Sequence, residues 1–221
     1  MIEQSVERIG ERFALTKLDT GEFASFRAAP LKLRSEQYSA EGLGNVSLLY
    51  GSAMAGLMRM ETLVIDPFER DLPLFSFDRI SALGNETMIL EYYDTLLRPN
   101  AFNIAALLLV KESVAQLREH DLGEHWYDYM KLPASFAKKT GRSALSRLET
   151  AFVEALDAYL AAAAQSTLLS ETEQTEKHKK ASAYVNGLLQ NGGPSTDAFV
   201  KSIGADKTRK LFRGIVFGTQ E

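Results

Sequence analysis

The feature that most constrains this 221-residue sequence is a strand-rich segment, residues 22–97, followed by a helix-rich half. Four stretches in the segment are rich in residues that favour strands, and glycine, asparagine and proline separate them. They are "FASFRAAPLKLRSEQYSA", "NVSLLYGSAMAGLMRMETLVI", "LPLFSFDRISAL" and "ETMILEYYDTLL". The links between them are too short for helical crossovers, so the pattern predicts antiparallel neighbours. We expect about six strands here, with Gly84-Asn85 as one hairpin turn.

Helical patterns lie on both sides of this segment. Residues 2–15 carry apolar side chains at helical spacing, which predicts an opening helix. After the segment, we expect helices over residues 102–119, 144–165, 171–190, 195–203 and 205–214. The order of helix, strands and helices predicts an α+β protein, a single domain over residues 1–221, in which helices cover an antiparallel sheet.

Composition excludes several classes of protein. The chain has no cysteine, which excludes disulfides, thiolate catalysis and cysteine-ligated metals and fits the reducing cytoplasm that we expect as its location. The net charge of −4 argues against general nucleic-acid binding. The first residues lack the apolar core of a signal peptide. The longest apolar run, "AFNIAALLLV", is shorter than the roughly 20 residues that a membrane-spanning helix needs.

Motifs for several common chemistries are absent from the sequence. The glycines form neither a dinucleotide-binding nor a phosphate-binding loop, and there is no G-x-S-x-G nucleophile elbow. His120 and His125 are five residues apart, which is a poor spacing for one metal on one helix face, and His178 is remote in sequence. We therefore expect no metal site and interpret His120 and His125 as loop or surface residues.

Three carboxylates lie inside a predicted strand pair, where core residues are expected. They are Asp78, Glu91 and Asp94. Alternate strand residues face opposite sides, so Glu91 and Asp94 cannot both point the same way. If one face of the sheet is open to water, one of these acids is a surface residue. If helices cover both faces, each acid is buried or lines a cavity, where a raised pKa would let it donate protons.

Three segments together resemble the ferredoxin-dependent bilin reductases, whose fold is shared by red chlorophyll catabolite reductase. "DPFERDLPLFSFDRI" is similar to a family segment in which Leu-Pro precedes bulky apolar residues and an aspartate. "ETMILEYYDTLL" falls where the family has a strand with a catalytic aspartate. "AYVNGLLQNGGPSTDAFVKSIGADKTRKLFRGIVFG" resembles the C-terminal signature. The resemblance covers roughly residues 55–217. The sequence departs from the family at Gly192, which replaces the aspartate of an Asn-Asp pair. The family's catalytic aspartate is usually followed by a residue or two and then proline, which neither Glu91 nor Asp94 has.

The resemblance implies a three-layer α/β/α sandwich with a linear tetrapyrrole such as biliverdin between the sheet and the C-terminal helices. It implies no bound cofactor, because reduced ferredoxin supplies single electrons and the protein supplies protons. The candidate catalytic residues are then Glu91, which we favour, Asp94 and Asn191, whose amide would hold a pyrrole N–H or a lactam oxygen. The candidate substrate-binding residues are Phe75, Asp78, Tyr92, Tyr93, Arg59, Arg79 and Lys32, the last three as partners of the propionates.

An acidic ferredoxin would need a basic docking surface. The second half of the chain has three basic clusters, around Lys138, Lys177 and Lys207. The candidates for docking are Lys138, Lys139, Lys207 and Lys210, from the first and third clusters. Such clusters are also typical of solvated helix faces. Two other functions stay open: a tetrapyrrole-binding protein of the same fold without the chemistry, and a reductase of another tetrapyrrole breakdown product.

Overall fold

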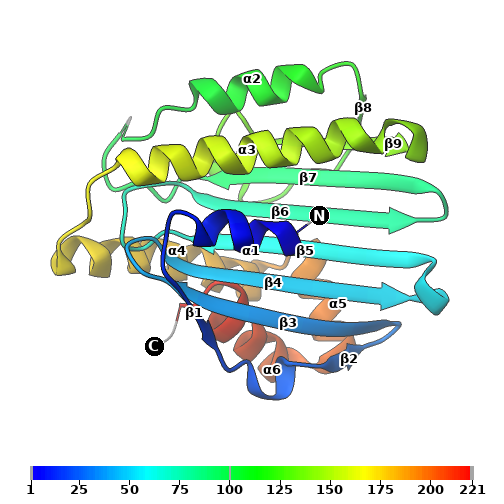
Figure 1. Cartoon of the computed structure of the whole chain (residues 1–221). Helices are drawn as coiled ribbons and strands as arrows, with labels where there is room; N and C mark the ends of the chain where they lie inside the picture. The colour runs from blue at the N-terminus through cyan, green and yellow to red at the C-terminus, as the bar shows by residue number, and fades with distance from the viewer. Residues whose placement is uncertain (1, 100, 220–221) are drawn as a thin grey trace.

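A nine-stranded antiparallel sheet forms the centre of the molecule, as the computed structural model shows for residues 2–99 and 101–219 (Figure 1). The strand order is β1-β3-β4-β5-β6-β7-β9-β8, and β2 pairs with β3. The strands are β1 (Leu15–Leu18), β2 (Phe26–Ala28), β3 (Leu31–Ala40), β4 (Gly44–Ala53), β5 (Met58–Asp66), β6 (Leu74–Ala82), β7 (Asn85–Tyr93), β8 (Arg118–Glu119) and β9 (Phe136–Gly141).

Helices cover both faces of the sheet (Figure 1). One layer contains α1 (Glu3–Gly10), α2 (Ala105–Ser113) and α3 (Leu145–Gln165). The other layer contains α4 (Glu171–Asn191), α5 (Pro194–Ile203), α6 (Ala205–Lys210) and the π-helical turn η5 (Leu211–Val216). Short 3-10 turns lie at η1 (Gly21–Phe23), η2 (Met54–Gly56), η3 (Asp128–Met130) and η4 (Arg142–Ala144). This is the three-layer α/β/α arrangement that the resemblance implied.

The strand count is larger than predicted. The segment 22–97 contributes β2 to β7, which matches the expected six, but β1, β8 and β9 come from outside it. The expected helix 102–119 ends at Ser113, and Arg118 and Glu119 pair with β9 instead. This pairing supplies hydrogen-bond partners to backbone groups that the edge strand β9 would otherwise leave open. The opening helix is likewise shorter than predicted, because β1 begins at Leu15.

The β6–β7 hairpin turns one residue earlier than predicted. Ala82 pairs with Asn85, so the two turn residues are Leu83 and Gly84 rather than Gly84 and Asn85. Both have positive φ, 50° and 82°. Two successive positive φ values are typical of the type I′ turn, whose twist matches that of a hairpin. This turn sets the register that decides which β7 side chains face which layer.

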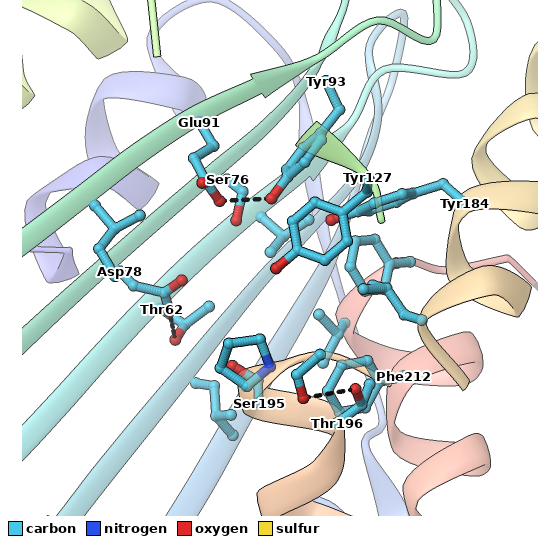
Figure 2. A pocket seen from close by; sticks show the side chains of 18 of the residues that line it. Thr62, Ser76, Asp78, Glu91, Tyr93, Tyr127, Tyr184, Ser195, Thr196 and Phe212 are labelled. Atoms are coloured by element: carbon cyan, nitrogen blue, oxygen red, sulfur yellow. Dashed lines mark hydrogen bonds between the residues drawn. The ribbon is translucent and has the colours of Figure 1, made fainter. Parts of the chain in front are cut away.

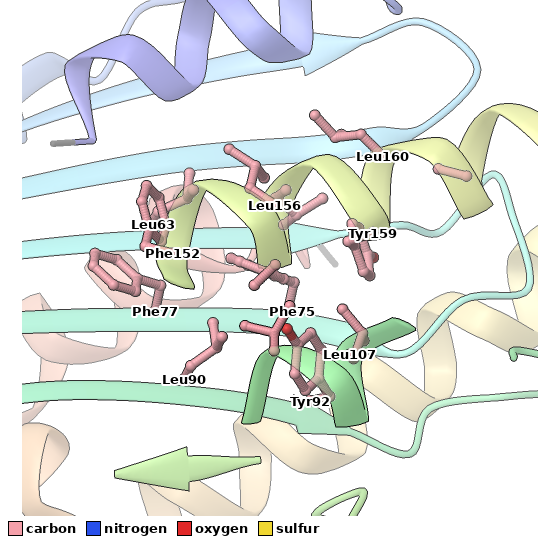
Figure 3. Packing of buried hydrophobic residues seen from close by; sticks show 14 of the residues in the cluster. Leu63, Phe75, Phe77, Leu90, Tyr92, Leu107, Phe152, Leu156, Tyr159 and Leu160 are labelled. Carbon is pink, nitrogen blue, oxygen red and sulfur yellow. The ribbon is translucent and has the colours of Figure 1, made fainter. Parts of the chain in front are cut away.

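Each face of the sheet has its own core. Leu63, Phe77 and Leu90 face α3, where the Phe77 and Phe152 rings lie 4.0 Å apart between centroids (Figure 3). The opposite face packs Val64, Leu74 and Tyr93 against the C-terminal helices, including Tyr184, Phe199 and Phe212. Coverage on both sides explains why the central strands carry apolar side chains on both faces of the sheet.

The prediction that Phe75 and Tyr92 bind the substrate is wrong. Both side chains lie in the closed core beneath α2 and α3, and their ring centroids are 5.6 Å apart (Figure 3). Their strand positions alternate with those of Asp78 and Glu91, so they point to the other face. Tyr93 is the one of the three predicted aromatic residues that faces the C-terminal helices.

Candidate functional site

A cavity lies between the sheet and the C-terminal helices (Figure 2). Strands β5, β6 and β7 supply polar side chains to one wall, and the start of α5 supplies Pro194, Ser195 and Thr196 to the other. Apolar side chains, including Met60, Leu188, Phe199 and Phe212, fill the remaining surface. The cavity volume is about 150 Å³. Its lining of many apolar groups and a few converging polar ones is typical of a ligand-binding site.

Asp78 is the central acid of this cavity. It is half-buried on β6, opposite Thr62 of β5. The Thr62 Oγ1 atom donates a hydrogen bond of 2.5 Å to Asp78 Oδ1 (Figure 2). Desolvation raises the pKa of Asp78 to about 6, with a further contribution from the Glu91 charge, while the bond from Thr62 opposes the rise. Asp78 can therefore carry a proton near neutral pH.

Glu91 is the second acid of the cavity. Its side chain shares the cavity face with Ser76, its partner across β6 and β7. Tyr93 Oη donates a hydrogen bond of 2.5 Å to Glu91 Oε2, and Lys131 Nζ lies 2.7 Å from Glu91 Oε1. Burial raises the pKa of Tyr93 well above its usual value, so the phenol stays a donor. Glu91 thus lies between two donors from the protein.

The other two predicted catalytic residues lie outside the cavity. Asp94 follows the end of β7 and is exposed, and its Oδ1 accepts a hydrogen bond of 3.1 Å from the Leu96 backbone N–H. Asn191 is the last residue of α4 and is also exposed. Gly192, with a φ of 81°, ends the helix and turns the chain, so the following residues reach the cavity instead. Of the two strand acids, Glu91 therefore faces the cavity, while the predicted place of Asn191 on its wall is wrong.

The cations predicted to bind propionates face the other side of the sheet. Arg79 follows Asp78 in the strand and so points the opposite way, where it pairs with Glu86 at 3.0 Å and with Glu61 at 3.4 Å. Arg59 and Lys32 are exposed at that same face and do not line the cavity. Strand alternation therefore overturns the predicted contact of these three residues with a ligand in this cavity.

The predicted docking lysines differ in their surroundings. Lys138 is only 2% exposed, and its Nζ donates to Glu119 and to the Leu117 carbonyl at 3.3 Å, so its predicted role in docking is wrong. The β8 strand, which was expected to be helical, covers it. Lys207 is exposed and pairs with Glu22 at 3.0 Å. Lys210 is exposed and Lys139 is half-buried.

Lys177 was expected in a surface cluster, but its side chain is completely buried. Its Nζ donates to the backbone oxygens of Leu72 and Thr95, the latter at 2.9 Å, and lies 3.6 Å from Asp71 Oδ1. Desolvation lowers the pKa of Lys177 to about 8, and the nearby carboxylates oppose that fall. Lys177 therefore ties α4 to the loops beside the sheet.

Several cavity residues escaped the sequence analysis. Tyr127, Tyr184 and Tyr93 form an aromatic cluster in which the Tyr93 and Tyr184 ring centroids are 4.5 Å apart (Figure 2). His125 stacks on Tyr127 at 5.0 Å and lines the cavity rather than the surface. The run "HWYDYMK" holds an unusual density of aromatic residues for a loop, and that signal could have indicated a ligand-binding wall.

The site offers carboxyl, phenol and imidazole groups to a ligand. Across residues 2–99 and 101–219, no three histidine, aspartate or glutamate side chains gather where they could hold a metal ion. Over the same residues, every helix is too short or too polar to cross a bilayer. The arrangement can bind a flat, largely apolar molecule between aromatic side chains and transfer a proton to it from Asp78.

Comparison with known proteins supports the fold. No protein-family model and no curated protein matches the sequence. The chain is similar to a solved structure of phytochromobilin synthase from tomato in complex with biliverdin, with a TM-score of 0.82 and 14% sequence identity. The similarity covers 99% of this chain and 82% of the tomato chain. This chain therefore has the fold of phytochromobilin synthase, a ferredoxin-dependent bilin reductase, which is the fold that the sequence resemblance implied.

Proposed function

We propose that this protein reduces a linear tetrapyrrole of the biliverdin type, with single electrons from ferredoxin and protons from the cavity. The observation that carries the proposal is Asp78, a carboxyl group with a pKa of about 6 at the wall of an aromatic-lined cavity. The fold adds support, because the similar tomato enzyme was solved with biliverdin.

Asp78 supplies the proton in this scheme. Proton transfer from its carboxyl group to a ring nitrogen or lactam oxygen makes the tetrapyrrole easier to reduce. An electron from ferredoxin then converts the protonated ligand into a neutral radical. A second electron and a second proton complete each two-electron step, and Asp78 regains its proton from water. The role that the sequence suggested for Glu91 therefore passes to Asp78, because Glu91 is held between Tyr93 and Lys131.

The substrate must widen the cavity. Its volume of about 150 Å³ is below the roughly 300–1,000 Å³ of pockets that enclose drug-sized ligands. Four segments outside the sheet line the cavity: the loop with His125 and Tyr127, α4, the start of α5, and the π-helical turn η5 with the residue after it. We infer that these segments move apart when a tetrapyrrole enters, while the sheet keeps Asp78 in place.

Ferredoxin docking is proposed at the exposed lysines of α6, Lys207 and Lys210. The half-buried Lys139 is the alternative, because it lies on β9 at the opposite edge of the sheet. Because the protein as a whole has a charge of −4, attraction of an acidic donor depends on such a local basic surface.

The test is an absorption titration with biliverdin followed by anaerobic addition of reduced ferredoxin. We expect a spectral change on binding and a second change on reduction. Asp78→Asn should keep binding and slow reduction by about a hundredfold or more, the scale of lost general acid catalysis. Asp94→Asn is the matched control, because Asp94 is exposed outside the cavity, and it should react like the wild type. Absence of any spectral change with biliverdin would refute the proposal.

A second candidate function is tetrapyrrole binding without reduction. The observation that favours it is the exposed position of Asn191 together with Gly192, which replaces the family's aspartate. In that case biliverdin binds, but reduced ferredoxin leaves the bound spectrum unchanged.

A further inference from the structure

Three large apolar side chains lie in water at one end of the sheet. Met54 is 59% exposed, Leu57 is 62% exposed and Leu83 is 73% exposed. The first two belong to the β4–β5 turn and the third to the β6–β7 turn, and both turns lie at the same end of the sheet (Figure 1). A single exposed leucine is ordinary, but neighbouring ones form a patch that is typical of an interaction site. These three residues are the apolar tip of the sheet.

The strand register makes the two turns neighbours. Met58, the first residue of β5, pairs with Ala82, the last residue of β6, and Ala82 pairs with Asn85 of β7. Leu57 and Leu83 therefore extend from two residues that lie side by side on adjacent strands, which are about 4.8 Å apart. The apolar side chains of both turns thus belong to one continuous edge.

The backbone of the turns gives no reason for large apolar residues at these positions. Met54 has a φ of 53° and Leu83 a φ of 50°. Positive φ favours glycine and asparagine, and a bulky side chain is strained there. Asparagine is the common residue at the first central position of a type I′ turn, where this chain has Leu83. Leu83 therefore costs backbone strain as well as apolar exposure, and a contact outside the turn would account for both.

Cations lie beside the apolar tip. A hollow of about 250 Å³ is lined by Leu57 together with Arg59, Arg79 and Arg142. Guanidinium groups match the geometry of phosphate oxygens and bind them with paired hydrogen bonds. The hollow therefore has the chemistry to receive a phosphate group.

Two of these three arginines are available to an anion. Arg79 already pairs with Glu86 at 3.0 Å and with Glu61 at 3.4 Å. Across residues 2–99 and 101–219, Arg59 and Arg142 form no ion pair, and both are exposed. The protein as a whole has a charge of −4, so the surplus of positive charge at this end is local.

We propose that this end of the sheet docks on an anionic membrane surface, with the apolar tip in the interfacial layer and a lipid phosphate between Arg59 and Arg142. Interfacial binding adds burial of apolar side chains to the attraction of cations by anionic headgroups, and this edge offers both. A soluble anion would engage the arginines but leave the apolar tip in water. The cavity lies on the other face of the sheet, so the inference goes beyond the proposed function and does not depend on it.

Co-sedimentation with lipid vesicles tests this inference. We expect the wild type to bind vesicles made of equal parts of phosphatidylcholine and phosphatidylglycerol, and to remain in solution with vesicles of phosphatidylcholine alone. Binding to the mixed vesicles should weaken as salt rises, because salt screens exposed charges.

Two double variants test the two parts of the surface. Arg59→Gln with Arg142→Gln removes two cations, each worth roughly fivefold in affinity near an anionic surface, so binding should weaken about tenfold or more. Leu57→Ser with Leu83→Ser should weaken binding by a similar factor, because it removes the apolar contribution. All four side chains are exposed, so both variants should show the thermal unfolding of the wild type.

Matched controls come from other parts of the chain. Leu109 on α2 is 73% exposed, as Leu83 is. Arg12 is an exposed arginine that follows α1, near the other end of the strands. Leu109→Ser and Arg12→Gln should bind the mixed vesicles as the wild type does. Controls that weaken binding as much as the double variants would overturn the inference, because they would show attraction without a specific surface.

The remaining outcomes separate this inference from the proposed function. Wild-type protein that does not bind the mixed vesicles overturns it, and so does equal binding by the wild type and both double variants. Slower ferredoxin-driven reduction in Arg59→Gln with Arg142→Gln, without any vesicle binding, also overturns it, because the hollow would then receive a soluble acidic partner. A failed titration with biliverdin overturns only the proposed function.

Discussion

Thr62 and Asp78 face each other across β5 and β6, and the threonine hydroxyl donates a hydrogen bond of 2.5 Å to the carboxylate. This bond stabilises the ionised form of Asp78, whereas burial and the nearby Glu91 charge favour the neutral form. The balance leaves the pKa of Asp78 at about 6. The pair therefore sets the pH range in which the cavity holds a transferable proton.

Loss of the Thr62 hydroxyl should move the pH dependence of reduction. In Thr62→Val, the Asp78 anion loses a donor, so the pKa of Asp78 should rise by up to about one unit. Turnover with ferredoxin requires neutral Asp78. The pH above which turnover declines should therefore be higher in Thr62→Val than in the wild type. The measurement is turnover against pH, with Ser76→Ala as a control on the same cavity wall. An identical profile for Thr62→Val and wild type would contradict the assignment of Asp78 as the proton donor.

Asp78 should also make stability depend on pH. Its pKa in the folded protein, about 6, exceeds the roughly 3.9 of an unfolded aspartate. The folded state therefore binds the proton more tightly, and its stability falls as the pH rises from about 4 to 6. Asp78→Asn should remove this loss. Between pH 4 and pH 8, the free energy of unfolding of the variant should therefore gain up to about 3 kcal/mol on that of the wild type. Urea unfolding of the two proteins at pH 4 and pH 8 measures these free energies. If variant and wild type differ by the same amount at both pH values, the pKa of Asp78 is not raised in the folded protein.

Gly187 should be needed for the loop that covers the cavity. A Cβ atom at this position of α4 would lie 2.1 Å from Trp126 Cη2, and Trp126 Nε1 donates to the Gly192 oxygen at 2.9 Å. Gly187→Ala should displace Trp126 and lower the free energy of unfolding by about 1–3 kcal/mol, the usual cost of overpacking. Gly214→Ala is the control, because a Cβ there meets nothing within 4 Å. Thermal unfolding and Trp126 fluorescence report the change. Equal behaviour of the two variants would show that the ring has room to move.

The docking proposal predicts a salt-dependent rate. Reversing Lys207 and Lys210 of α6 to glutamate should slow ferredoxin-driven reduction at low salt and leave biliverdin affinity unchanged. The difference from wild type should shrink as salt rises, because the Debye length is about 10 Å at 0.1 M salt and about 3 Å at 1 M. Arg12→Glu is a control on an exposed residue that follows α1, in the other helical layer. A wild-type rate that does not change with salt would mean that these lysines play no part in docking.

Local sequence patterns determined much of the architecture. The spacing of strand-forming residues predicted the six strands between residues 22 and 97, and helical periodicity predicted α3 and α4 nearly to their ends. Strand alternation also separated Glu91 from Asp94, and the structure places Glu91 in the cavity and Asp94 in solvent. These features depend on neighbours a few residues apart, so the order of residues alone is sufficient to predict them.

Only the tertiary structure decided which face of the sheet encloses a cavity. Phe75 and Tyr93 have similar local patterns, yet α3 packs closely against the first while the C-terminal helices leave space beside the second. The same holds for Lys138, which β8 covers, and for Lys131, which reaches Glu91 from a loop about 40 positions along the chain. The physical reason is that burial and charge pairing depend on elements distant in sequence, whose packing no local period encodes.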